Sequence, residues 1–125
     1  MTREVYRDNS RLYGPTDENS LLNACNLAQS LMRLRRYEEA ARTIRPHVGP
    51  AQKKLGADHD LVLRLQESLA YSSARAATSR KEKVEALITM QAVYERRLRV
   101  FGAAHPHTRQ CESYLAWMLK RFGSV

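Results

Sequence analysis

The sequence predicts an all-α fold built from repeated antiparallel helical hairpins. Two short motifs recur along the 125-residue chain with the same spacings, which is typical of a repeat architecture. The composition agrees, because only five Gly and four Pro interrupt a chain rich in Ala, Leu, Arg and Glu. We expect about five to six helices in a single domain, since a chain of this length is too short for two independent cores.

The repeat is defined by two motifs that recur at the same separations along the chain. Residues 26–28, 68–70 and 114–116 all end in Leu-Ala, at separations of 42 and 46 residues. Residues 12–14, 54–56 and 100–102 all end in an apolar side chain followed by Gly, again at separations of 42 and 46 residues. Two different motifs with one shared spacing indicate a true repeat, with one helical hairpin in each unit.

In this register the chain divides into four successive parts. We expect residues 3–14 to be the end of a preceding second helix, and residues 17–56 to be the first repeat. Residues 58–102 are the second repeat, and residues 105–123 are the first helix of a truncated third repeat. Each unit of a repeat stack buries its face against a neighbour. Self-association through the uncovered end helices is therefore one option for the partner.

Within the first repeat, apolar residues at helical spacing form two stripes. The first stripe contains Leu21, Ala24, Leu27, Ala28, Leu31 and Leu34, and the second contains Tyr37, Ala40, Ala41, Ile44 and Val48. Pro46 and Pro50 fall inside the second helix, where proline removes a backbone donor and clashes with the preceding turn. We therefore predict a kink, or a break into a helix over residues 37–45 and a shorter piece ending near residue 55.

Local signals mark the helix ends of the later repeats. Ser79 and Glu82 have the spacing of a capping box, and Pro106 fits the first position of a helix. Gly56 and Gly102 fit left-handed helix stops. The second repeat has four extra residues around positions 76–80, which we expect to lengthen its turn or its first helix.

With these motifs in view, the chain resembles the long tetratricopeptide repeat of kinesin light chains. The resemblance rests on residues 26–28, 36–40 and 54–60, and it covers residues 5–122. It implies a right-handed α-α superhelix of antiparallel hairpins, in which the first helix of each repeat lines a concave face. It also implies a scaffold that binds a peptide or a partner protein without catalysing a reaction.

The resemblance further implies which side chains would contact a partner on the concave face. By register these are Asn26, Gln29, Arg33, Arg64, Tyr71, Arg75, Tyr114, Trp117 and Arg121. Arginine binds carboxylates bidentately, and Tyr and Trp offer rigid contact area, so an acidic peptide with an apolar or aromatic anchor suits such a groove. The alternative for Tyr114 and Trp117 is a structural role in the core or at the end of the stack.

Catalytic motifs are missing from the sequence. It contains neither a Gly-rich phosphate-binding loop nor a nucleophile motif. His59 and His105 fall in the turns between repeats, where we expect them to hydrogen-bond the turn or to cap a helix. No cluster of Cys or carboxylates completes a metal site with His105 and His107. We therefore expect no enzyme activity, no cofactor and no metal ion.

The net charge of +8 bears on the partner and not on the fold. Lys and Arg are spread along the sequence, so nucleic acid is a less favoured partner unless the fold gathers the positive charge on one face. Cys25 and Cys111 form neither a disulfide framework nor a zinc motif, which favours a reducing compartment.

We expect a cytoplasmic protein without a membrane partner, because no apolar run is long enough to cross a bilayer. The first residues carry no apolar signal segment. The alternative to a free-standing module is a fragment or regulatory appendage of a larger repeat-containing protein or enzyme.

Overall fold

A computed structural model describes residues 18–122 of the chain. These residues form five helices and no strand, which confirms the all-α prediction for this part of the chain. The helices are α2 (Glu18–Arg33), α3 (Tyr37–Leu55), α4 (Asp60–Ala76), α5 (Arg80–Phe101) and α6 (Pro106–Phe122). The helix end expected over residues 3–14 lies outside the described residues.

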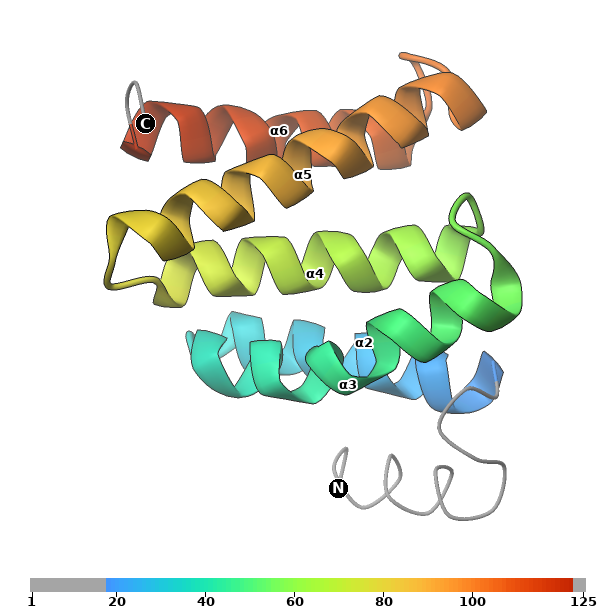
Figure 1. Cartoon of the computed structure of the whole chain (residues 1–125), viewed down its shortest axis with the longest axis horizontal. Coiled ribbons are helices and arrows are strands. Elements are labelled where there is room, and N and C mark those ends of the chain that lie inside the picture. Colours follow the sequence, from blue (N-terminus) through green and yellow to red (C-terminus); the bar gives the residue numbers. More distant parts are fainter. Residues whose placement is uncertain (1–17, 123–125) are drawn as a thin grey trace.

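Each helix packs on the next one along the chain, and α4 also contacts α2 and α6. The turns within the two hairpins, residues 34–36 and 77–79, lie at one edge of the molecule together with the C-terminal end of α6 (Figure 1). We call this the hairpin edge. The turns between hairpins, residues 56–59 and 102–105, lie at the opposite edge, which we call the return edge (Figure 1).

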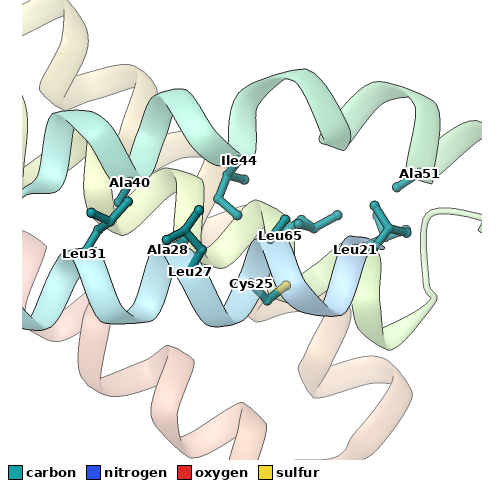
Figure 2. Packing of buried hydrophobic residues seen from close by; sticks show 11 residues of the cluster. Leu21, Cys25, Leu27, Ala28, Leu31, Ala40, Ile44, Ala51 and Leu65 are labelled. Carbon is teal, nitrogen blue, oxygen red and sulfur yellow. The ribbon is translucent and has the colours of Figure 1, made fainter. Parts of the chain in front are cut away.

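The core of the first hairpin depends on small residues. Ala40 and Ala51 of α3 face Leu31 and Leu21 of α2, and Ile44 lies between them (Figure 2). All five side chains are buried. Alanine at the contact lets the helix axes approach closely, so that the larger leucine and isoleucine side chains fill the remaining space.

Leu34 departs from the predicted apolar stripe. Its side chain is 65% exposed, because α2 ends at Arg33 and Leu34 lies in the turn that follows. The other predicted members of the first stripe are buried. Leucine periodicity alone could not distinguish the last turn of the helix from the residue after it.

The helix α3 runs from Tyr37 to Leu55 without interruption, so the predicted break at Pro46 and Pro50 is wrong. The two prolines are exposed and four residues apart, which places them on the same side of the helix. The carbonyl groups that lose an amide partner therefore lie on the solvent side, where water can satisfy them. The axis of α3 changes direction in its second half, which corresponds to the predicted kink (Figure 1).

Gly56 and Gly102 end α3 and α5 with positive φ angles of 95° and 88°. Their amides donate to the carbonyls of Gln52 and Leu98, four residues earlier. Their ψ angles of 155° and 164° lie outside the left-handed helical region, so the predicted left-handed stops are wrong in this detail. The backbone region that they occupy is essentially restricted to glycine, which explains the glycine register.

The other predicted helix signals are confirmed, except for the longer turn. The Ser79 Oγ accepts from the Glu82 amide at 3.2 Å, and α6 begins at Pro106. Both turns within hairpins contain three residues, so the extra residues of the second repeat do not lengthen its turn. They lengthen the helices instead: α4 has 17 residues against 16 in α2, and α5 has 22 against 19 in α3.

A buried arginine joins the second hairpin to α6. Arg97 of α5 is 1% exposed, and its Nε donates to Glu67 Oε1 of α4 at 3.2 Å. Its Nη1 donates to Asp60 Oδ1 at 3.3 Å, and its carbonyl accepts from Thr108 Oγ1 of α6 at 3.2 Å. Burial raises the pKa of Glu67, while the positive charge of Arg97 acts in the opposite direction.

The outward face of α6 is polar. At the register positions where α2 carries buried Leu21 and Ala24, α6 carries exposed Arg109 and Glu112. The apolar side chains of α6 pack inward against the second hairpin: Tyr114, Leu115, Trp117, Met118 and Phe122. Leu119, which is 48% exposed, is the large apolar side chain left on the outside. This face offers little apolar area to a second copy, which argues against self-association through α6.

No helix within residues 18–122 combines the length and the apolar character needed to cross a membrane.

We predict that Arg97→Ala lowers the free energy of unfolding by about 3–5 kcal/mol near pH 7, because it leaves the Glu67 carboxylate buried without its cation. The loss should become smaller near pH 4, since the raised pKa of Glu67 lets protonation remove the unpaired charge. Urea unfolding at the two pH values measures both effects.

The matched control is Arg96→Ala. Its ion pair with Asp58 is exposed to solvent, so this variant should lose no more than about 1 kcal/mol. If Arg97→Ala lost the same free energy at both pH values, the buried charge of Glu67 would not be the cause.

Candidate partner-binding site

A cluster of aromatic rings lies between α3, α4 and α6, towards the hairpin edge. The Tyr71 ring stacks on Tyr114 with centroids 4.4 Å apart and meets Trp117 edge to face at 5.7 Å. Tyr37, the first residue of α3, meets Tyr71 edge to face at 6.3 Å. We call these four residues, together with Arg75, the aromatic cluster.

The Arg75 guanidinium is held between two of these rings. Its central carbon lies 4.8 Å from the centroid of Tyr37 and 4.6 Å from that of Trp117. Its Nη1 donates to the Tyr71 hydroxyl at 3.4 Å. Contacts of this kind contribute about 0.5–2 kcal/mol each, depending on how dry the site is. Within residues 18–122 no carboxylate forms an ion pair with Arg75, so the rings position its charge without neutralising it.

The repeat explains why arginine stands at this position. Arg33, Arg75 and Arg121 are separated by 42 and 46 residues, and each lies in the last turn of its helix. A cation in the last turn interacts favourably with the partial negative charge of a helix C-terminus. The Arg121 guanidinium lies 5.4 Å from the Trp117 ring. Arginine at this register therefore stabilises three helix ends, and Arg75 and Arg121 also contact the rings of the site.

The structure brings together five of the nine predicted site residues: Tyr71, Arg75, Tyr114, Trp117 and Arg121. Asn26, Gln29 and Arg33 are exposed on α2, and no hydrogen bond, ion pair or ring contact within residues 18–122 links them to the cluster. Arg64 is half-exposed, with its Nε 4.0 Å from Asp60 Oδ2 on its own helix. The candidate site therefore centres on the second and third repeats.

One member of the site, Tyr37, is not among the predicted site residues, whereas Gln110 lies on the predicted concave face. Tyr37 was placed in a core stripe, because the sequence pattern does not show that the start of α3 lies beside the end of α4. Gln110 Nε2 donates to the Tyr114 hydroxyl at 3.1 Å and fixes its orientation. In this stack the end of α4, a first helix, lies beside the start of α3, the second helix of the preceding repeat. A three-dimensional arrangement of hairpins is needed to predict that contact.

Tyr114 and Trp117 are partly buried and pack against the core, as the structural alternative requires. Both also keep part of their surface exposed. Burial and then the negative charge of Glu67 raise the pKa of Tyr114, so its hydroxyl stays neutral. The two residues therefore combine packing with a solvent-facing edge.

The histidines serve the turns. His59 Nδ1 accepts from the Leu61 amide, and His105 Nδ1 accepts from the His107 amide, both at 3.1 Å. This confirms that they cap helices. His107 Nδ1 lies 3.2 Å from Asp60 Oδ1, a neighbour that sequence reasoning missed. Among the residues that the structure describes, no group of three His, Cys, Asp or Glu side chains is placed to hold a metal ion.

Both cysteines are buried in the core. Burial raises the pKa of Cys25 to about 11 and that of Cys111 to about 12, and the charge of Glu67 also raises the latter. A thiol with such a pKa is protonated near neutral pH and is a poor nucleophile. The surroundings of Cys25 and Cys111 are those of packing residues.

The chain matches no protein-family model and no curated protein. Its resemblance to the kinesin-light-chain repeat therefore rests on the sequence registers.

We predict that neither thiol reacts with a disulfide-exchange reagent in the folded chain near pH 8, because both are buried and protonated. Both thiols should react once guanidinium chloride unfolds the protein, which absorbance of the released thiolate measures. Ser113→Cys, on the exposed surface of α6, is the control and should react at once. Rapid labelling of the unaltered folded chain would show that the core opens.

Proposed function

We propose that the chain is a non-catalytic protein-interaction module of the tetratricopeptide type. Its partner would be a peptide or protein segment bound on the surface formed by α2, α4 and α6. Two features support this arrangement: α4 contacts both α2 and α6, and the repeat registers place equivalent residues on these three helices. In a superhelix of hairpins such alternate helices share one concave face.

The observation that carries the proposal is the position of the Arg75 guanidinium, which is ordered by rings and has no carboxylate partner within residues 18–122. It is clamped between Tyr37 and Trp117. A side chain that is already ordered loses little entropy when it binds, and a planar guanidinium accepts a carboxylate through two parallel hydrogen bonds. This chemistry suits an Asp or Glu side chain of a partner.

The neighbouring rings supply apolar contact area. Tyr37, Tyr114 and Trp117 are each partly exposed beside the guanidinium. Aromatic rings bury large areas with few rotatable bonds, and they are enriched where partners bind tightly. The favoured ligand is therefore an acidic segment that also carries an apolar or aromatic side chain.

The single tryptophan of the chain gives a direct test, because Trp117 lies in the aromatic cluster. We predict that acidic peptides containing an apolar residue change the emission of Trp117, while the same peptides with Lys in place of Asp and Glu do not. Arg75→Ala should weaken binding by about 10- to 100-fold, since it removes a charge-assisted pair.

The control is Arg42→Ala, which removes an exposed arginine of α3 and should leave binding unchanged. Circular dichroism shows whether both variants remain helical. Equal affinity for the acidic and the lysine-bearing peptides, or an equal effect of the two substitutions, would refute the assignment of Arg75.

A further inference from the structure

Positive charge is concentrated at the hairpin edge. Nine basic side chains lie in or beside its turns and at the end of α6: Arg33, Arg35, Arg36, Arg75, Arg80, Lys81, Lys83, Lys120 and Arg121. Three acidic side chains accompany them: Glu38, Glu39 and Glu82. Nine positive and three negative charges give this edge a formal charge of +6, whereas the whole chain carries +8. The sequence hides this, because the fold brings distant segments to one edge (Figure 1).

The two edges differ in how their charges are paired. At the return edge, Arg96 Nη1 lies 3.0 Å from Asp58 Oδ1, and Arg97 is held by Asp60 and Glu67. At the hairpin edge, Arg36 forms an ion pair with Glu39. The ion pairs found within residues 18–122 include none of the other eight basic side chains of this edge. Glu82 accepts instead from Ser79 and caps α5. Most of the positive charge at the hairpin edge is therefore not neutralised by the described part of the chain.

Helix stability does not account for several of these cations. Arg80, Lys81 and Lys83 occupy the first turn of α5, where the partial positive charge of the helix disfavours a cation. Arg35 has a φ of 61°, a conformation that Gly or Asn adopts at lower cost. Two turns thus carry basic residues at positions where the fold alone would favour other residues. A ligand with negative charge would offset the unfavourable position of the cations in the first turn of α5, and Arg35 would be a further cation for it.

We infer that the hairpin edge binds the phosphate backbone of a single-stranded nucleic acid. Interfaces with nucleic acids are strongly positive, while the centres of protein interfaces are depleted of charged residues. Leu34 is the large apolar side chain exposed among the turn residues, too little for the apolar centre of a protein interface. Arginine outnumbers lysine at this edge, which suits bidentate binding of phosphate.

The aromatic cluster favours a single strand over a duplex. Tyr37 and Trp117 border the hairpin edge and are partly exposed, so unstacked bases can pack against them while the backbone follows the cations. This inference goes beyond the proposed function, and the two surfaces share Tyr37, Arg75 and Trp117. Arg80 and Lys81 carry it, whereas Arg75 carries the proposed peptide site.

The test uses a fluorescein-labelled oligouridine of about 20 nucleotides and measures its anisotropy over a range of salt concentrations. We expect a dissociation constant in the micromolar range near physiological salt. The logarithm of the binding constant should fall with the logarithm of salt concentration with a slope of about −3, as expected when about four phosphates are engaged.

The decisive variant is the double substitution Arg80→Glu and Lys81→Glu. Acidic residues suit the first turn of a helix, so α5 should be stabilised while binding weakens by about tenfold or more and the salt slope becomes shallower. The matched control is Lys53→Glu with Lys54→Glu, an equal change of charge at the return edge. This control should retain the affinity of the unaltered chain, and circular dichroism should show both variants to be helical.

Three results would overturn the inference. The first is that the unaltered chain does not bind the oligouridine. The second is an equal loss in both double variants, which would mean that binding follows net charge and not the hairpin edge. The third is tighter binding to polyglutamate or to phosphatidylserine vesicles than to the oligouridine, if the Arg80 and Lys81 double variant weakens that binding. This result would assign the edge to an acidic protein or to a membrane surface.

Discussion

The close approach of helices through alanine is the constraint on which the rest of this structure depends. Ala28, Ala40, Ala70 and Ala86 are all buried at helix contacts. Because each hairpin closes in the same way, α2, α4 and α6 run in the same direction and end at one edge (Figure 1). That alignment places Arg75 beside the start of α3 and beside Trp117 of α6. The aromatic cluster and the basic hairpin edge are both consequences of this geometry.

The position of α6 depends on a second interaction, which is polar. Arg97 reaches Glu67 and Asp60 of α4 through its side chain and Thr108 of α6 through its carbonyl. Burying Arg97 and Glu67 has a desolvation cost, but their ion pair fixes α5 against α4. The Arg97 carbonyl, which accepts from Thr108 Oγ1, then holds α6 on this pair of helices. Tyr114 stacks on Tyr71 only while α6 keeps this position. The candidate site is therefore coupled, through the position of α6, to the ion pairs of Arg97.

Local signals in the sequence predicted the local features of the fold. Ser79, Pro106 and the two glycines mark helix ends through contacts within a few residues, and all four do so in the structure. The predicted break at Pro46 and Pro50 was wrong. The free-energy cost of proline inside a helix depends on whether the carbonyls that lose their amide partners face water, and the sequence pattern does not show this. The role of Tyr37, the ion pairs of Arg97 and the gathering of charge at one edge depend on which segments meet in space. Hydrophobic periodicity does not show which segments meet in space, whereas a three-dimensional arrangement of the hairpins does.

The arginines of this chain show why net charge does not identify a partner. Arg97 is buried between carboxylates, so its charge is used inside the fold. Arg75 is ordered by rings and has no carboxylate partner within residues 18–122, so it is prepared for one anion in one geometry. Arg80 is exposed at a helix start that disfavours it, and its charge contributes to a long-range field. Paired, clamped and unpaired cations thus serve stability, recognition of a single carboxylate and attraction of an extended polyanion, although all contribute equally to the formal charge of +8.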